Sequence, residues 1–320
     1  IQKLMKDNLG SVMGEDYDYS SWDGDKWEDE MIALYNVSGT MATKNTNNED
    51  VINFDDFEDM SEIKMTTVEA CKDNIEYSEM IQKLMKDNLD PVMGENYDYS
   101  SWDGGKWRVE MTALYNVSGT MATKNANGES VINFDDFEDM SEIKMTTVAA
   151  CRDNINGSEM IQKVMEDNLD PVMGENYDYS SWTGDKWEDE MTALYNVSET
   201  MSTKNAKDED VINFDDFEDM SEIKMTTIGA CRDNIENSEM IQDLMKDNLG
   251  SIMGDDYDYS SWDGNKWKVE MTSLYEISDT IKTKNTKNEY IIDLSSDLVG
   301  TEVKLITIEA VSNNSHSDII

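Results

Sequence analysis

Apolar residues recur at helical spacing in the stretch that begins at Ser78. Between residues 81 and 89 they are separated by three or four positions, which places them on one side of a helix: Ile81, Leu84, Met85 and Leu89. Ser78 is a residue type that caps helix N-termini, and Pro91 and Gly94 are types that end helices. The pattern therefore predicts a helix that starts at Ser78 and stops before Pro91.

A second amphipathic stretch follows the loop at residues 94–101. Trp107, Met111 and Leu114 fall on one face of a helix. Three residues just before it are candidate N-caps: Ser100, Ser101 and Asp103. A second helix is therefore predicted from this point.

The segments after the second helix favour β-structure. Residues 115–124 alternate between two faces and are rich in poor helix formers, which predicts a strand. Asn127 and Gly128 form a hairpin-turn signal before a second predicted strand at residues 130–134. A third strand is predicted at residues 143–150, which are rich in β-branched residues. The unit is therefore predicted to be α+β, with two helices and a three-stranded antiparallel meander.

The whole pattern returns every 80 residues. The phrase YDYSSW begins at Tyr17, Tyr97, Tyr177 and Tyr257. We therefore predict four tandem repeat units, with bounds at residues 1–76, 77–156, 157–236 and 237–320. The fourth copy diverges after Thr280, and a repeat array needs an atypical last unit to cover its outer face. We therefore interpret residues 237–320 as a C-terminal cap.

The charge of the chain limits its partners. Seventy acidic and 26 basic residues give a formal net charge of −44, which is 44/4 = 11 negative charges per copy. A chain this acidic repels nucleic acid and anionic membranes, and it attracts divalent cations and basic surfaces. The sequence contains no apolar run long enough to span a bilayer and no recognisable signal peptide, so no membrane insertion is predicted.

The cysteines and sequons bear on the compartment. Cys71, Cys151 and Cys231 occur once per copy, and Val311 replaces them in the fourth. This spacing cannot build a disulfide framework within each unit, so free buried thiols in a reducing compartment are predicted. Three N-V-S sequons leave secretion open: Asn36, Asn116 and Asn196.

Two groups of carboxylates are the candidate metal ligands, because Ca²⁺ takes six to eight oxygen ligands that acidic loops supply. The first group lies between residues 16 and 30: Asp16, Asp18, Asp23, Asp25, Asp29 and Glu30. The second lies between the second and third predicted strands: Asp55, Asp56, Glu58 and Asp59. Acidic counterparts in the later copies are candidates too: Asp98, Asp103, Glu110, Asp135, Asp136, Asp139, Asp178, Asp185, Glu190, Asp215, Asp216, Asp219, Asp256, Asp258, Asp263 and Glu270. No cofactor other than Ca²⁺ is predicted.

Residues 125–137, which read NANGESVINFDDF, resemble part of an EF-hand loop with its exiting helix. The resemblance places four residues at ligand positions one, three, five and twelve: Asn125, Asn127, Glu129 and Asp136. It implies the alternative fold, which is mainly α-helical with helix–loop–helix repeats that bind Ca²⁺. The copies depart from the family pattern at position six, where glycine is replaced: Asp50, Ser130, Asp210 and Tyr290. Lys207 and Lys287 also stand at the third position, and Ser296 at the twelfth.

The residues that usually carry catalysis are scarce. His316 is the only histidine, which excludes Ser-His-Asp and Cys-His catalysis within the repeats. Phosphate-binding and dinucleotide-binding glycine motifs are absent, as are CxxC and HExxH. The chain is therefore predicted not to be an enzyme. Among the aromatic residues, Trp27 is expected in the core, and Tyr17 and Tyr19 are expected to brace the loop or contact the next unit.

Near-identical copies present the same surface at regular intervals, which suits contact with a repeated partner. The leading hypothesis is a structural, filament-forming or adhesive repeat protein that makes multivalent contacts through its acidic loops. Its expected partners are other copies of itself, a polymeric protein, basic surfaces or divalent cations. Two alternatives stay open: a Ca²⁺-binding repeat protein, and an acidic mimic of nucleic acid that occupies nucleic-acid-binding proteins.

Overall fold

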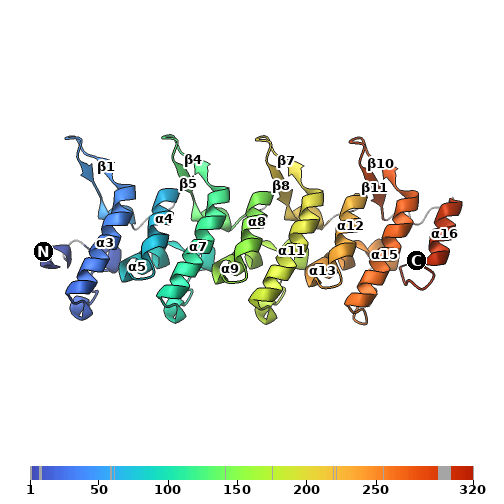
Figure 1. Ribbon diagram of the computed structural model, residues 1–320, viewed down its shortest axis with the longest axis horizontal. Helices are drawn as coiled ribbons and strands as arrows, with labels where there is room; N and C mark the ends of the chain where they lie inside the picture. The colour runs from blue at the N-terminus through green and yellow to red at the C-terminus, as the bar shows by residue number, and fades with distance from the viewer. Residues whose placement is uncertain are drawn as a thin grey trace. The chain divides into compact units, whose positions relative to one another are not determined.

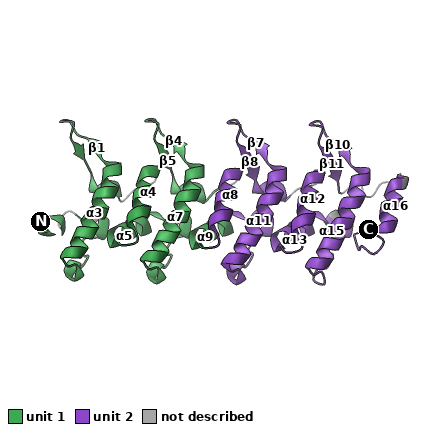
Figure 2. Ribbon diagram, in the orientation of Figure 1, with its two compact units in different colours: residues 1–140, 157–167 green, residues 141–156, 168–320 purple. Residues whose placement is uncertain are grey.

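The computed structural model describes residues 2–6, 9–57, 60, 62–140, 142–174, 176–218, 220, 222–254, 256–294 and 304–319. It contains two compact units, which Figure 2 distinguishes by colour. Unit 1 comprises Ile1–Met140 and Gly157–Asp167, and unit 2 comprises Ser141–Asn156 and Asn168–Ile320. Helices and short antiparallel strands recur in both units at 80-residue intervals, which confirms the α+β class and the tandem repeat (Figure 1). The bounds of the four repeat units stay a prediction.

Unit 1 contains the elements of the first copy, those of the second copy up to Met140, and most of the first helix of the third copy. Its helices are α1 (Gln2–Lys6), α2 (Gly10–Met13), α3 (Gly24–Met41), α4 (Met65–Asn74), α5 (Glu79–Asn88), α6 (Asp90–Met93), α7 (Gly104–Met121) and, up to Asp167, α9 (Glu159–Asn168). Its 3₁₀-helices are η1 (Tyr19–Ser21), η2 (Phe54–Phe57), η3 (Tyr99–Ser101) and η4 (Phe134–Phe137). Its strands are β1 (Thr43–Lys44), β2 (Asp50–Val51), β3 (Ile63–Lys64), β4 (Thr123–Lys124) and β5 (Ser130–Ile132).

Unit 2 contains the last elements of the second copy and most elements of the third and fourth copies. Its helices are α8 (Met145–Asn154), α10 (Asp170–Met173), α11 (Gly184–Met201), α12 (Met225–Asn234), α13 (Glu239–Asn248), α14 (Gly250–Met253), α15 (Gly264–Ile281) and α16 (Leu305–Asn313). Its 3₁₀-helices are η5 (Tyr179–Ser181) and η6 (Phe214–Phe217). Its strands are β6 (Glu142–Lys144), β7 (Thr203–Lys204), β8 (Asp210–Asn213), β9 (Glu222–Lys224), β10 (Thr283–Lys284) and β11 (Tyr290–Asp293).

Long and short helices alternate within each unit. In unit 1 the ten-residue helix α4 packs between the 18-residue helices α3 and α7 (Figure 1). In unit 2, α8 packs on α11, α12 packs between α11 and α15, and α16 packs on the far side of α15. Within the units, α4 and α12 each therefore fill the space between two long helices.

The first predicted helix is confirmed as α5. The side chain of Ser78 accepts a hydrogen bond from the amide of Ile81 at 3.1 Å, as an N-cap does. One detail of its end is corrected, because Pro91 does not end this helix. Pro91 lies in the first turn of the next helix, α6, where its missing N–H is not needed. Gly94 ends α6 with φ near +83°.

The predicted strand at residues 115–124 is wrong over most of its length. The helix that Asp103 caps continues to Met121, and only Thr123–Lys124 form a strand. The buried positions Leu114, Val117 and Ser118 continue the 3.6-residue spacing of Trp107. Packing of this face therefore outweighs the low helix propensity of the segment.

The third predicted strand is likewise too long. Only Glu142–Lys144 form strand β6, and residues 145–154 form helix α8, on which Thr147, Val148 and Cys151 are buried. The same segment is helical in every copy that the structure describes. β-branched residues at helical spacing pack here as a helix face, so their β propensity misled the prediction.

The three-stranded antiparallel sheets are confirmed, but they are not meanders. Each sheet has the hairpin of one copy and a third strand from the preceding copy, in the orders β3-β5-β4, β6-β8-β7 and β10-β11-β9. In the first of them Ile63 pairs with Ile132, and Thr123 pairs with Val131. The hairpin turn at Asn127 and Gly128 is confirmed, since the amide of Gly128 donates to the carbonyl of Asn125 at 2.9 Å. Pairing between copies therefore ties each repeat to the one before it.

The core is aromatic and methionine-rich. Its largest fully buried side chains recur from copy to copy: Trp107, Trp187, Trp267, Phe57, Phe137 and Phe217. In the part of the chain that the structure describes, no helix combines the length and apolar character needed to cross a membrane.

Candidate functional site

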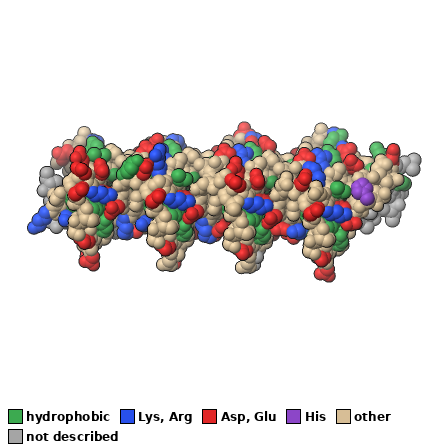
Figure 3. Space-filling view, turned by 60° about the horizontal axis from the view of Figure 1, so that its bottom comes forward, with side chains coloured by type: hydrophobic (Ala, Val, Ile, Leu, Met, Phe, Trp, Pro, Cys, Tyr) green, Lys and Arg blue, Asp and Glu red, His purple; other side chains and the backbone are tan. Residues whose placement is uncertain are grey.

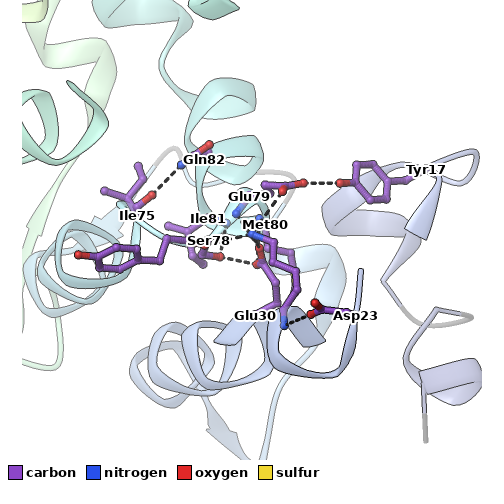
Figure 4. Close-up of polar contacts among 11 residues, drawn as sticks. Tyr17, Asp23, Glu30, Ile75, Ser78, Glu79, Met80, Ile81 and Gln82 are labelled. Atoms are coloured by element: carbon purple, nitrogen blue, oxygen red, sulfur yellow. Dashed lines mark hydrogen bonds and ion pairs between the residues drawn. The ribbon is translucent and has the colours of Figure 1, made fainter. Parts of the chain in front are cut away.

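A buried glutamate links each long helix to the helix that starts the next copy. Glu30 of α3 is fully buried, and its carboxylate faces the first turn of α5 (Figure 4). It accepts hydrogen bonds from Ser78 Oγ at 2.6 Å and from the amides of Glu79 at 2.7 Å and Met80 at 3.2 Å. Lys26 Nζ lies 2.8 Å from its Oε1. We call this arrangement the glutamate clasp.

The clasp recurs in every copy. Glu110 accepts from Ser158 Oγ at 2.6 Å, and Glu190 accepts from Ser238 Oγ at 2.5 Å. A carboxylate at a helix N-terminus satisfies amides that have no partner within the helix and interacts favourably with the helix dipole. Glu30 and its counterparts therefore accept hydrogen bonds from the N-terminus of the next helix. A metal ion could bind these carboxylates only by displacing the serine hydroxyl and the backbone amides that donate to them.

The fourth copy keeps the clasp although its loop is one residue shorter. Glu270 accepts from Ser317 Oγ and from the amides of Asp318 and Ile319. Ser317 stands three residues after Asn314, whereas Ser78 stands four residues after the equivalent Asn74. Burial is the largest influence on the Glu270 carboxyl and raises its pKa, but the hydrogen bonds from Lys266 and Ser317 lower it on balance.

The other members of the first acidic group lie apart from the clasp. Asp18 caps η1 by accepting from the amide and the hydroxyl of Ser20, both at 2.9 Å, and these bonds lower the pKa of its carboxyl. Asp23 caps α3 by accepting from the amide of Lys26 at 2.9 Å. Asp16 and Asp25 are exposed to solvent. The group therefore consists largely of turn and helix caps.

The second acidic group is exposed where it is described. Asp59, Glu58 and Asp219 lie outside the described residues, as does the side chain of Asp55. Asp56 accepts from Asn53 Nδ2 at 3.1 Å. The described counterparts of this acidic group in the next two copies are exposed: Asp135, Asp136, Asp139, Asp215 and Asp216. Among the described residues, no three His, Cys, Asp or Glu side chains come together in a group able to hold a metal ion. Ca²⁺ binding at these residues stays a prediction.

Residues 125–137 do not have the EF-hand architecture. Residues 123–137 form strand β4, a tight turn, strand β5 and the 3₁₀-helix η4 instead of a loop with an exiting helix. Asn125, the expected first ligand, accepts from the amides of Asn127 and Glu129, both at 3.0 Å, and so holds the turn closed. Glu129 Oε1 lies 2.9 Å from Lys64 Nζ of the third strand. These side chains therefore stabilise the hairpin and its junction with the preceding copy.

Trp27 lies in the core, as expected, and its counterpart Trp107 packs against the aromatic side chains of the loop before it. Tyr99 stacks on Trp107 with ring centroids 5.2 Å apart, and Trp102 meets Trp107 edge to face at 4.7 Å. Tyr17 reaches the next copy, where its hydroxyl donates to Glu79 Oε2 at 2.6 Å. Burial and this hydrogen bond raise the pKa of Tyr17 to about 12. The loop therefore braces the same junction as the clasp.

The asparagines of all three sequons lie within long helices, Asn36 in α3, Asn116 in α7 and Asn196 in α11. Asn36 Nδ2 donates to Asn74 Oδ1 at 3.0 Å, and Asn196 Nδ2 donates to Asn234 Oδ1 at the same distance. Each of these bonds joins a long helix to the short helix packed on it.

The three cysteines are free and fully buried, and burial raises the pKa of each thiol to about 12. We expect Cys71, Cys151 and Cys231 not to react with a thiol reagent in the folded chain at mildly alkaline pH, because reaction needs an accessible thiolate. Absorbance with Ellman's reagent, before and after unfolding in guanidinium, measures this. Full labelling before unfolding would contradict the buried placement.

A groove in unit 2 has an acidic rim. It has a volume of about 400 Å³ and lies between α8, the end of α11 and the β7–β8 hairpin. Its lining residues are Met145, Thr146, Ala149, Tyr195, Glu199, Ser202, Asp208, Glu209 and Asp210. Lys144 pairs with Glu209 at 3.2 Å, and Lys204 pairs with Asp210 at 3.0 Å. None of the ion pairs among the described residues involves Glu199 or Asp208, so the groove carries excess negative charge.

Several differences between the second and third copies lie in this groove. Six of its lining residues come from α11 and the hairpin, and four of the six differ from the second copy. Glu199, Ser202, Asp208 and Asp210 replace Gly119, Ala122, Gly128 and Ser130. None of these four was among the candidate site residues, although their variation within otherwise similar copies was a readable signal. Figure 3 shows that carboxylates also spread widely over the surface, with basic side chains among them.

No protein-family model, no curated protein and no solved structure matches this chain. The fold and the groove therefore define a class only: an acidic α+β tandem-repeat protein.

Proposed function

We propose that this chain is a non-enzymatic structural scaffold whose repeated acidic surfaces bind basic segments of a repeated or polymeric protein partner. The groove beside Tyr195 carries this proposal. It offers apolar side chains for the stem of a lysine or arginine and carboxylates on its rim for the charged head, beside a Tyr195 ring that already carries the guanidinium of Arg152 at 4.5 Å.

A single groove of this kind binds weakly. Exposed ion pairs contribute about 0.2–1 kcal/mol each, so two or three of them do not give tight binding. Linked sites bind more tightly than single ones because the second contact becomes intramolecular. A partner that carries several basic segments therefore gains affinity when it contacts acidic side chains in more than one copy.

We expect the double variant Asp208→Gly/Asp210→Ser to bind a basic peptide about five-fold more weakly than the unchanged chain. Two rim carboxylates together contribute about 1 kcal/mol, which corresponds to this factor. The second copy has these residues at the equivalent positions, so the hairpin tolerates them. The probe is a fluorescent peptide with four arginines separated by glycine and serine, followed by anisotropy at low and high salt.

The matched control is Asp185→Gly/Asp189→Val, which removes the same two charges and also takes its residues from the second copy. It leaves the groove unchanged, so its peptide affinity should fall by less than half as much. Equal losses in the two variants would mean that binding follows net charge alone and would contradict the groove.

Ca²⁺ binding and imitation of nucleic acid stay predictions of the sequence. The acidic side chains of the described residues act mainly as caps, clasps and hairpin contacts, which favours neither of them.

A further inference from the structure

The fourth copy builds the surroundings of the groove from equivalent elements. Helix α12 packs on α15, and the β10–β11 hairpin follows the end of α15, as the β7–β8 hairpin follows α11 beside the groove. Residues 80 positions further along the sequence therefore stand at the places of the groove residues: Tyr275 for Tyr195, Asp279 for Glu199, Lys282 for Ser202, Glu289 for Glu209 and Tyr290 for Asp210.

In the fourth copy a lysine of the chain itself occupies part of this space. Lys282 is the C-cap of α15, and its ammonium pairs with the carboxylate of Asp279 one helical turn earlier. The same ammonium lies 4.6 Å from the centre of the Tyr290 ring. Only 25% of the Lys282 side chain is exposed. We call the space beside the C-cap of the long helix, between the helix and the hairpin, the C-cap site.

The third copy has no basic residue at its C-cap. Ser202 is the C-cap of α11, and its short side chain donates a hydrogen bond to the carbonyl of Glu199 at 3.1 Å. Both residues line the groove of about 400 Å³. The C-terminal end of a helix carries partial negative charge and stabilises a cation beside it. The C-cap site of the third copy therefore offers the helix end and the carboxylate that hold Lys282 in the fourth copy, without the lysine.

The third-copy site is also the more acidic of the two. Asp208 and Asp210 line the groove, and the fourth copy has no acidic residue at either position. A second lysine is common to both copies, since Lys204 pairs with Asp210 at 3.0 Å and Lys284 lies 4.7 Å from the centre of the Tyr290 ring. The residue at the C-cap is therefore the cation that distinguishes the two sites.

We propose that the groove binds a lysine side chain of the partner at its C-cap site, and that Lys282 closes the equivalent site of the fourth copy to partners. The bound ammonium pairs with Glu199 as Lys282 pairs with Asp279. This inference rests on the proposed function and deepens it, because it names the side chain that is bound and the residue that decides which copy binds it.

Exchanging the two C-cap residues tests this inference. We expect Ser202→Lys to weaken binding of a fluorescent peptide with four lysines about five-fold, because the new lysine occupies the site. Lys282→Ser should strengthen binding up to about two-fold, since a second site of similar affinity adds to the first. In the double variant, Lys282→Ser should recover about two-fold over Ser202→Lys alone. Anisotropy of the peptide with the full chain measures each affinity, and tryptophan fluorescence on heating verifies that each variant is folded.

Two hairpin substitutions are the matched controls. Asn47→Lys adds one positive charge and Lys287→Asn removes one, at equivalent positions where the copies already carry both residue types. Lys287 belongs to the same hairpin turn that precedes Tyr290, so its loss removes a charge near the fourth-copy site without removing Lys282. Each control should change the affinity by less than half as much as the C-cap exchange of the same charge. Equal changes would mean that net charge alone governs binding and would overturn the inference.

The same measurements separate this inference from the proposed function. Binding that falls in Asp208→Gly/Asp210→Ser but responds to neither C-cap exchange would overturn the C-cap site and leave the scaffold proposal standing. Binding of the arginine peptide without binding of the lysine peptide would have the same meaning. A chain that binds neither peptide would contradict both proposals.

Discussion

Replacing Gly104 with alanine is expected to destabilise the folded chain by about 2 kcal/mol. Gly104 begins helix α7 and lies against the backbone of the preceding copy. A Cβ at this position would overlap the carbonyl oxygen of Glu76, and neither backbone can move without disturbing the clasp and the helix packing around it. The same close approach occurs at Gly184 with Asn156 and at Gly264 with Glu236.

Gly24 is the matched control, since it occupies the same position in the first copy with no atom within 4 Å of the added Cβ. Gly24→Ala should therefore leave stability unchanged or raise it by up to about 1 kcal/mol, because alanine favours the helix. Urea unfolding followed by tryptophan fluorescence compares the two variants in the same unit. Similar midpoints for Gly24→Ala and Gly104→Ala would refute the close approach.

The sequence predicts the elements that depend on local signals. Ser78 and the apolar spacing behind it define α5, and Asn127 with Gly128 defines the hairpin, because caps and tight turns are set by neighbouring residues. Residues 115–121 satisfy a two-residue and a 3.6-residue period at once. The choice between strand and helix there depends on burial of Val117 and Ser118 against other elements, which the local pattern does not contain.

The sheet illustrates a second limit. Its third strand comes from the preceding copy, so Ile63 pairs with Ile132 across a separation of 69 residues (132 − 63). In an exact repeat each strand has equivalent candidates within its own copy and in the neighbouring copies. The sequence therefore gives no reason to prefer the neighbour, and the prediction chose the nearest strand.

The candidate site residues show the same difference between what neighbouring residues determine and what depends on contacts distant in sequence. The sequence identifies carboxylates but not what they face, so Glu30, which accepts from a helix N-terminus, was grouped with exposed Asp16 and Asp25. The groove was missed for a different reason. Glu199 and Asp208 are nine residues apart in sequence and meet only because the hairpin folds back beside α11.

Glu190→Ala is expected to cost about 3 kcal/mol of stability, the largest effect that we predict for a single side chain. Glu190 is fully buried and accepts from Ser238 Oγ and from the amides of Glu239 and Met240 at the start of α13. Removing it leaves Ser238 Oγ and the two amides without their carboxylate, while Lys186 keeps Glu239 as a partner at 3.3 Å. It also removes a negative charge from the positive end of the helix dipole.

Asp189→Ala provides the control, because Asp189 is the neighbouring residue on α11, carries the same charge and is exposed. It should change stability by less than about 0.5 kcal/mol. Urea unfolding gives the stability of each variant, and hydrogen exchange at the amides of Glu239 and Met240 locates the change. Faster exchange at these amides in Glu190→Ala, with little change in Asp189→Ala, is the expected pattern. Equal effects of the two substitutions would mean that net charge, and not the clasp, holds the copies together.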